Sequence, residues 1–518
     1  MTKATIITNA TVLTCDTSNR CGKYHLAISR GRVADISDHL DRLVKMYPDA
    51  EMLDASGKLI LPGFVNAHFH GESFLLQTLT RGIHFALWNQ IDPLRQTRDR
   101  LVHPATATAI APLYEAVSTA HLRSGTTIVG EFPPAYDEQS FEEMRKGIQS
   151  TGITALFALQ TWDHVRRARA LGAKRPPVAV TLGAERDLTL YSIESALKGA
   201  RELNEPLLVH TAEQRDEAEQ FRRHFTKGIV GLLHSLNTLN ERTILVHGNH
   251  LDEDEVALIK SAGGSVIVCP RSTAAKQTGY PALRHLARRH IRLALGTDWG
   301  SVDMLEEMRF MMQLPQVVPD LRFFTPIEIV RMATINGATA LGLGKETGSI
   351  EIGKRADLVF FSVHTMRLPL PAASTTEETV ARMVVESLTS GDVSDVMIGG
   401  EFVIRERTLQ RRSEETVIES FRDICGKLLP SIPMTIPVQV RTEPANILPF
   451  TADVRTSQGE PPESFLSGYT PVQKTPPDVE PPKPAPHPLV NRPRVQREPI
   501  KPELPKDTRR VFGEDEDI

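Results

Sequence analysis

The sequence predicts an α/β protein built on a (β/α)8 TIM barrel, with a small β-sandwich and a disordered proline-rich tail. Three observations predict this fold. Short apolar runs alternate with longer amphipathic segments in the middle of the chain, strand-like segments lie near both of its ends, and prolines gather beyond about residue 430. The first pattern is typical of repeated βα units that form a parallel sheet.

Eight apolar runs are the expected barrel strands. They are LPGFVNAHFH (61–70), TTIVGEF (126–132), TALFALQ (154–160), VAVTLGA (178–184), PLLVHTA (206–212), TILVHGN (243–249), SVIVCPR (265–271) and IRLALGT (291–297). The active site of a (β/α)8 barrel lies at the C-terminal ends of its strands. Polar residues that close these runs are therefore candidates for chemistry.

The two ends of the chain carry the segments expected to form the β-sandwich. Residues 1–60 contain TIITNATVLT and YHLAISRGRVADI, and residues 347–425 contain GSIEIGKRADLVFFSV and VSDVMIGGEFVIRERTL, with turns marked by glycine. We expect these two blocks to form one domain. The barrel, residues 61–346, is then inserted into it.

Residues 426–518 form the expected tail. Fourteen of the 36 prolines lie from Pro461 onward, and aromatic residues are sparse there. Such a segment buries too little apolar surface to offset its ordering entropy, and its prolines favour the extended polyproline II conformation. A flexible extension is the simpler interpretation, and docking to proline-recognising modules is the alternative.

Composition limits the range of partners. The 518 residues carry a net charge of −4 with both signs interspersed, so the chain has no field that favours nucleic acid or an anionic membrane. No apolar stretch reaches the roughly 18 residues of a membrane span. The four cysteines show no paired spacing, and the N-terminus alternates like a strand rather than a signal peptide. These features predict a cytoplasmic protein that acts on a small molecule.

Histidines and acidic residues close several of the apolar runs. They are His68 and His70 in NAHFH, His210 and Glu213 in VHTAE, His247 in LVHGNH and Asp298 in LGTDWG. Residues i and i+2 of a strand point to the same side, so His68 and His70 can hold one ion. Taken singly, each residue has a simpler explanation, such as a histidine satisfied by backbone groups or an aspartate that caps a segment. Their joint occurrence at strand ends favours a catalytic metal site.

This set of residues suits hydrolysis. Three imidazoles and a carboxylate leave room for a water on a divalent ion, which lowers the pKa of that water to about 7. Glu213 can take a proton from the water and deliver it to a ring nitrogen or a leaving group. Asp298 can accept a second proton. His247 can stabilise the atom that gains charge at the tetrahedral centre.

The sequence resembles the amidohydrolase superfamily over about residues 5–410. The resemblance rests on PGFVNAHFH, HTAE, the strand-end His247, GTD at 296–298 and GSIEIGKRADLV. Within the superfamily, the pattern is most similar to the branch of cytosine, guanine and methylthioadenosine/S-adenosylhomocysteine deaminases and triazine hydrolases.

The resemblance implies roles for individual residues. His68, His70, His210 and Asp298 would bind one zinc or iron ion, Glu213 would be the proton shuttle, and His247 would orient the attacking hydroxide or the substrate. The run at 178–184 has no lysine at its end, so the bridging carbamylated lysine of dinuclear relatives is not expected. Relatives often dimerise or form tetramers, which leaves a homo-oligomer open, although the sequence itself does not indicate the oligomeric state.

Three residues are candidates for binding the substrate. His84 and Trp88 lie in RGIHFALW, and an aromatic residue of this loop contacts the bound base in related deaminases; a role for Trp88 in the ordinary core fits equally well. Arg271 in VCPRST replaces the Ser-His and Asn of many relatives and suits an anionic or carbonyl-bearing group. Trp299 is bulkier than the residues usually found after the metal-binding aspartate, which indicates a reshaped pocket.

The predicted activity is hydrolytic removal of an amino group from a purine-, pyrimidine- or nucleoside-like ring. Hydrolysis of a cyclic amide and displacement of chloride from a triazine use the same site and remain alternatives. A non-catalytic scaffold with a proline-rich tail is an alternative of another class. Retention of all four expected ligands argues for catalysis, since scaffolds on this fold typically lose them.

Overall fold

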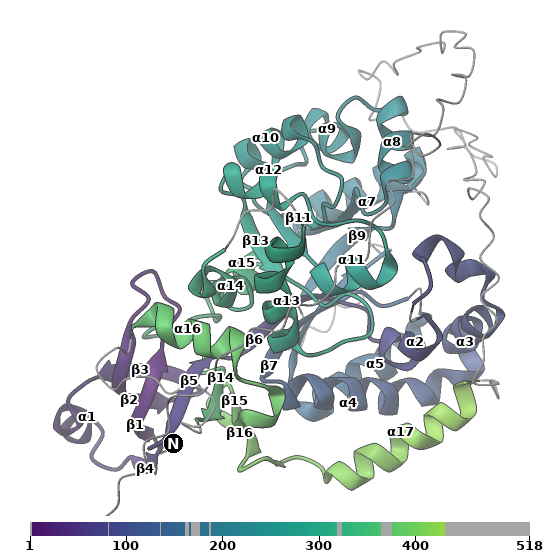
Figure 1. The fold of residues 1–518 in the computed structure, drawn as a ribbon. Coiled ribbons are helices and arrows are strands. Elements are labelled where there is room, and N and C mark those ends of the chain that lie inside the picture. Colours follow the sequence, from purple (N-terminus) through teal and green to yellow (C-terminus); the bar gives the residue numbers. More distant parts are fainter. Residues whose placement is uncertain are drawn as a thin grey trace, which may run out of the picture. The chain divides into compact units, whose positions relative to one another are not determined.

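Eight parallel strands form the barrel of this computed structural model (Figure 1). The strands follow the order of the chain around the barrel: β6 (Phe64–Phe69), β7 (Thr126–Glu131), β8 (Thr154–Leu159), β9 (Val178–Leu182), β10 (Leu207–Thr211), β11 (Thr243–His247), β12 (Ser265–Val268) and β13 (Arg292–Leu295). Nearly all of their residues are buried, as expected of parallel strands covered on both faces. The predicted fold class is therefore confirmed.

The structure describes residues 3–80, 82–134, 136–160, 165–166, 177–185, 188–318, 324–363 and 376–429. All of these lie in one unit of the chain, Met1–Val472. The predicted tail and its docking to proline-recognising modules lie outside the described residues from position 430 onward.

The barrel closes at the strand ends that carry the expected metal ligands. β6 and β13 meet through a bridge between Phe69 and Asp298. The Asp298 N–H donates to the carbonyl of His68 (2.9 Å), and the His70 N–H donates to the carbonyl of Asp298 (3.0 Å). The backbone of the candidate site is thus the seam of the barrel.

The first predicted run is divided between the two sheets. β5 (Lys58–Pro62) belongs to the small β domain and β6 to the barrel, with Gly63 between them. A Cβ at Gly63 would lie 2.3 Å from the side chain of Thr127. Only glycine fits this close approach, and the chain changes sheets there.

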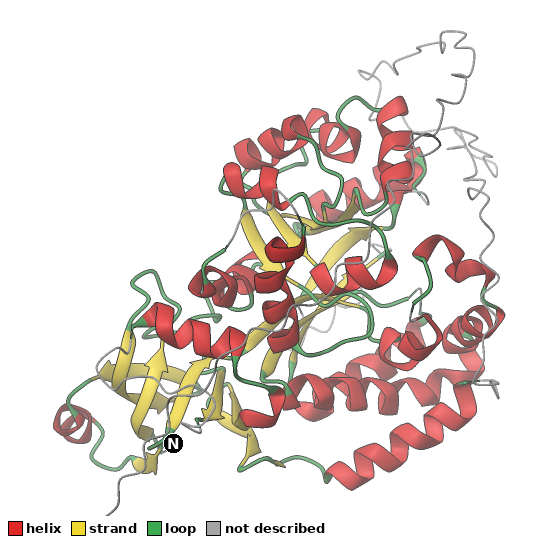
Figure 2. Ribbon diagram, in the orientation of Figure 1, coloured by secondary structure: helices red, strands yellow, loops and turns green. Residues whose placement is uncertain are grey.

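Helices surround the barrel (Figure 2). Those that follow the strands are α2 (Ser73–Thr80), α3 (Asp92–Val102), α4 (Ala107–Arg123), α5 (Glu138–Thr151), α7 (Leu190–Leu203), α8 (Arg215–His224), α9 (Gly228–Ser235), α10 (Glu253–Ala262), α11 (Pro270–Lys276), α12 (Leu283–Arg288), α13 (Met304–Val317), α14 (Pro326–Met332) and α15 (Ile335–Ala340). Two 3-10 helices, η1 (Phe85–Gln90) and η2 (Pro104–Thr106), lie in the loops that flank α3. Local signals set many ends: α10 starts with a capping box between Asp252 and Glu255 and stops at Gly263, whose φ is 73°.

The small β domain combines both ends of the described chain, as predicted. Its strands form one hydrogen-bonded sheet of nine: β1 (Thr5–Leu13), β2 (Cys21–Ser29), β3 (Arg32–Ser37), β4 (Glu51–Asp54), β5, β14 (Leu358–Ser362), β15 (Val393–Ile398), β16 (Glu401–Arg405) and β17 (Thr408–Leu409). The sheet curls on itself, because Gly31 at its β2–β3 turn accepts a backbone bond from Ala356, which in turn accepts one from Gly400 at the β15–β16 turn. One face encloses an apolar core, while α1 (Leu40–Met46) packs against β1, β2 and β3.

Two C-terminal helices pack on the barrel, although the sequence assigned 347–425 to β structure. α16 (Glu377–Glu386) contacts α13 and α14, and α17 (Glu414–Leu428) lies along α4 (Figure 1). Phe421 of α17 packs against Phe74, with ring centroids 5.5 Å apart and the two ring planes tilted by 49°. The second block of the chain is therefore shared between the β domain and the helical layer. None of the helices in the described ranges is long and apolar enough to cross a membrane.

Candidate active site

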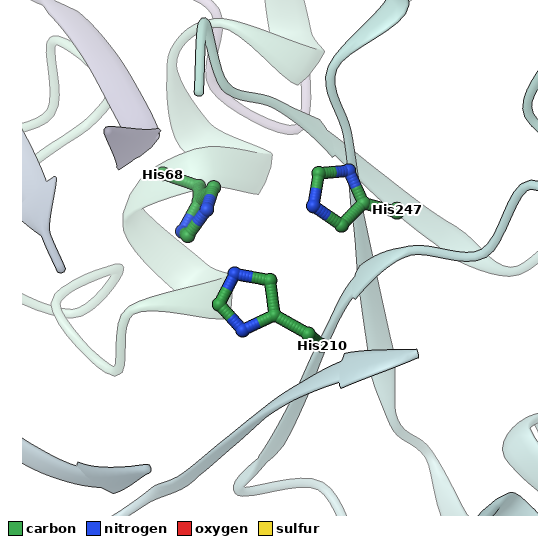
Figure 3. A group of neighbouring side chains, drawn as sticks. All are labelled: His68, His210 and His247. Carbon is green, nitrogen blue, oxygen red and sulfur yellow. The ribbon is translucent and has the colours of Figure 1, made fainter. Parts of the chain in front are cut away.

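Side chains from four strands converge at the C-terminal end of the barrel. His68 lies in β6, His210 in β10 and His247 at the end of β11, and Figure 3 shows their imidazoles turned toward one another. The ring centroids of His68 and His210 are 5.0 Å apart, and those of His68 and His247 are 5.8 Å apart. Asp298 follows β13, and its Oδ1 lies 3.6 Å from His68 Nε2 and 3.4 Å from His70 Nε2. The structure thus brings the four predicted ligands, together with His247, into one cluster.

The donor atoms of this cluster fit a divalent cation. Among the described residues, both ring nitrogens of His68 and His247, Nδ1 of His210 and Oδ1 of Asp298 are buried without a hydrogen-bond partner. Buried polar atoms left unpaired are costly and rare, and a bound ion satisfies them. Three overlapping groups have ligand atoms within 4.8 Å of one another: His68–His210–His247, His68–His70–Asp298 and Glu213–His247–Asp298.

The protonation states also suit metal ligation. Burial lowers the pKa of His68 to about 4 and that of His210 well below its ordinary value, so both imidazoles are neutral near pH 7. Burial by itself would raise the pKa of Asp298, but the nearby ammonium of Lys276 holds it well below its usual value. Neutral imidazole and ionised carboxylate are the forms that bind metals.

The backbone is strained at three of the strand ends. Ala212, His247 and Asp298 have φ values of 47°, 74° and 55°, in the left-handed region that non-glycine residues seldom occupy. Ala212 is held there by its N–H, which donates to Glu185 Oε1 (3.0 Å). Strained backbone conformations of this kind are kept only where the surrounding structure holds the residue in place, and they are common at functional sites.

Glu213 and His247 face each other beside the imidazole cluster. Oε2 of Glu213 lies 3.7 Å from Nε2 of His247, and both side chains are buried. Burial by itself would raise the pKa of Glu213, but attraction to the protonated form of His247 and to the ammonium of Lys276 outweighs it and lowers the pKa of this carboxyl. Burial lowers the pKa of His247. The pair therefore combines an ionised carboxylate with a neutral imidazole.

Lys276 is a site residue that the sequence analysis missed. It ends α11, and its Nζ donates to Asp298 Oδ2 (2.5 Å) and to Glu213 Oε1 (3.0 Å). Its side chain is only 5% exposed, whereas lysines are seldom fully buried unless they are paired. A single lysine on a short helix gives no signal in the sequence that distinguishes it from a solvated one.

A cavity of about 500 Å³ opens beside this cluster. His70, His210, Glu213 and Lys276 line one part of its wall. Aromatic and charged side chains line other parts of the wall: Phe85, Phe132, Trp299, Glu72 and Arg98. The cavity joins flat apolar surfaces to the polar groups of the cluster, as small-molecule sites commonly do.

The chain matches the sequence profile of the family described as "Amidohydrolase family" over residues 59–403. The protein belongs to this amidohydrolase family. Curated relatives of this amidohydrolase include the 5-methylthioadenosine/S-adenosylhomocysteine deaminases of Pyrococcus abyssi (27% identical, covering 76% of this chain and 94% of the relative) and Pyrococcus furiosus (28%, covering 72% and 90%). The predicted family is therefore confirmed.

Solved structures share the fold of this amidohydrolase. A zinc-bound adenosine deaminase from Xanthomonas campestris matches with a TM-score of 0.70 at 24% identity, covering 82% of this chain and 98% of that one. A zinc-bound atrazine chlorohydrolase from Arthrobacter aurescens matches with a TM-score of 0.70 at 18% identity, covering 82% and 100%. At these identities the likeness shows the fold.

The three predicted substrate-binding residues do not line the cavity. Trp88 is buried, its Nε1–H donates to the carbonyl of Ile83 (3.0 Å), and its ring packs 4.8 Å from that of Trp299. His84 is exposed and accepts the Ala86 N–H at the start of η1. Instead, the cavity wall is formed by Phe85 from the same loop and by Trp299.

Arg271 is turned to a different part of the molecule. Its guanidinium pairs with Glu306 (2.6 Å) and donates to Ser301 (2.8 Å), both near the start of α13. Gly183, Ala184 and Glu185 directly follow β9, and none of the three is a lysine. The single-ion site stays a prediction.

Proposed function

We propose that this amidohydrolase is a metal-dependent hydrolytic deaminase. It removes an amino group from a purine-, pyrimidine- or nucleoside-like ring and releases ammonia. The observation that carries the proposal is the set of unpaired buried donor atoms on His68, His210, His247 and Asp298, beside a cavity that also exposes Glu213. Deaminases among the curated relatives support the same reaction class.

His68, His70, His210 and Asp298 would hold one divalent ion. Zinc is the first choice because imidazole and carboxylate ligands suit it, with iron as the alternative. When bound, such an ion acts as a Lewis acid and lowers the pKa of a water in its coordination sphere. The zinc in the adenosine deaminase of the same fold supports this choice.

Protein groups account for the proton transfers. Glu213 is ionised and accepts the proton of the attacking water, then gives it to the ring nitrogen next to the reacting carbon. The neutral His247 stabilises the atom on which charge develops. Asp298 accepts the second proton from the hydroxyl group of the tetrahedral centre and passes it to the amino group. The carbon–nitrogen bond then breaks, ammonia leaves, and the ring carbon gains a carbonyl oxygen. Atoms balance as one water consumed for each ammonia released.

The aromatic cavity wall suits a flat ring. Phe85, Phe132 and Trp299 present ring faces or edges to the cavity, and such surfaces bind heteroaromatic rings by stacking. The volume of about 500 Å³ accommodates a base with a substituent. This supports a nucleoside-like substrate as well as a free base.

The test is a panel of aminopurines, aminopyrimidines, aminopterins and their nucleosides, incubated with protein loaded with zinc or iron. Ammonia release above the metal-free control supports the proposal. Release of chloride from a chlorotriazine, or opening of a cyclic amide without ammonia, would replace it by one of the alternative hydrolyses. Protein that retains no metal after loading would contradict the metal site itself.

We further propose a cytoplasmic setting and self-association. All four cysteines are free thiols in the structure, which suits a reducing compartment. Size-exclusion chromatography with light scattering tests the homo-oligomer, and a monomer at micromolar concentration would contradict it.

A further inference from the structure

We propose that Lys276 is a positioning residue of this site, which fixes how the carboxylates of Asp298 and Glu213 are turned. The inference rests on the proposed metal site. Lys276 extends from the end of α11 into the space between the two carboxylates and is the cationic partner of both.

The two carboxylates divide their oxygens in the same way. Oδ2 of Asp298 accepts from Lys276 Nζ (2.5 Å) and from the hydroxyl of Ser272 (2.6 Å), while Oδ1 faces the imidazoles of His68 and His70. Oε1 of Glu213 accepts from Lys276 (3.0 Å), while Oε2 faces His247. Each carboxylate therefore gives one oxygen to Lys276 and turns the other toward the imidazole cluster.

The ammonium has little freedom to change partners. Its Nζ lies 4.7 Å from the ring centre of Phe85 and 5.9 Å from that of Trp88, so aromatic rings lie beside it. A cation over ring faces is held by their electron density. Because the two carboxylate bonds are charge-assisted and shielded from water, they are strong and directional.

Charge alone does not explain a lysine at this position. A fixed positive charge beside a cation site weakens binding of a divalent ion, because like charges repel most strongly where water is excluded. A residue present only to strengthen ion binding would be neutral or acidic. Lys276 instead lowers the affinity for the ion but fixes the orientation of both carboxylates. Oδ1 of Asp298 is left for the ion, and Oε2 of Glu213 is left for proton transfer.

The experiment uses full-length protein loaded with cobalt(II), which absorbs visible light according to its ligand geometry, unlike d¹⁰ zinc. Lys276→Met removes the ammonium at similar length, Lys276→Arg keeps a charge that can reach both carboxylates, and Lys345→Met, at an exposed lysine, is the matched control. Cobalt stoichiometry, the d–d spectrum, and kcat and KM on the best substrate are measured. Circular dichroism checks the fold.

We expect Lys276→Met to change the shape or intensity of the cobalt spectrum. We also expect it to lower kcat roughly 10- to 100-fold with KM within about threefold, since orientation is lost while ground-state binding persists. Lys276→Arg should recover part of both signals, and Lys345→Met should match the wild type. Loss of cobalt from a folded Lys276→Met protein also supports the inference, because removing a cation would by charge alone tighten binding.

A cobalt spectrum of Lys276→Met that superimposes on that of the wild type overturns the inference. If Lys276→Met does not fold, Lys276→Gln takes its place with the same criterion. The spectrum needs no substrate, so a failure of the proposed deaminase activity is distinguished from a failure of the positioning role.

Discussion

Replacing Glu213 by glutamine separates the proton shuttle from the metal site. Glutamine has the same shape, its carbonyl oxygen can still accept from Lys276, and Lys276 keeps its 2.5 Å bond to Asp298. Loss of one charge from the buried pair should therefore cost only about 1–2 kcal/mol of folding stability. The four proposed ligands are untouched, so bound metal should stay at one ion per chain.

Turnover should fall much more than stability. A positioned general acid–base contributes about 10²- to 10⁴-fold, which equals about 3–5 kcal/mol of activation free energy at 1.36 kcal/mol per tenfold. The assay is kcat for ammonia release, with metal content measured on the same sample and Glu241→Gln, at an exposed site, as the control. If Glu213→Gln retained full kcat, the shuttle role would be refuted. If it lost its metal, Glu213 would be a ligand instead.

Three further predictions concern the ion, the core and the tail. Asp298→Ala should reduce bound zinc to well below one ion per chain by elemental analysis, because it removes the anionic donor; full zinc occupancy would show that the histidines suffice. Burial lowers the pKa of His121 to about 4, so the unfolded chain takes up a proton on this residue at higher pH than the folded chain does. As pH falls from 6.5 to 4, this difference should lower the free energy of unfolding by up to about 3 kcal/mol. The loss of Tm over that range should be smaller in His121→Gln, and an equal loss would assign it to other groups. Removal of residues 430–518 should leave kcat/KM within about twofold, because the site and α17 lie within the described residues; an inactive truncated protein would give the tail a role in catalysis.

The barrel and its candidate ligands were readable from the sequence because their signals are local. Each barrel strand is one apolar run, and His68, His210 and Asp298 each stand at or just past the end of such a run. Parallel strands carry their C-terminal ends to one face of a barrel, so the sequence positions of these residues predicted their convergence. Their role as ligands stays a prediction until an ion is bound and measured.

The missed features depend on contacts between distant segments. The pairing of Lys276 with Asp298 arises from how α11 approaches the seam of the barrel, and no spacing along the chain records it. In the loop after α2, a 3-10 turn brings Phe85 to the cavity and leaves Trp88 behind it. One turn of such a helix decides which aromatic ring faces the cavity, and composition cannot show it. Helix α17 is a different case, because its signals are local: Ser413 caps its start, and Val417, Ile424 and Leu428 recur at helical spacing.

The closure of the barrel at Asp298 has a mechanical consequence. Its first and last strands, some 230 positions apart in the sequence, are held at this end by two backbone bonds, those of the Asp298 and His70 amides. An ion bound by His68, His70 and Asp298 would link the first and last strands of the barrel. The amide hydrogens of Asp298 and His70 should therefore exchange with solvent faster once a chelator has removed the ion. Binding of the metal would then complete the site and stabilise the closure of the barrel in one step.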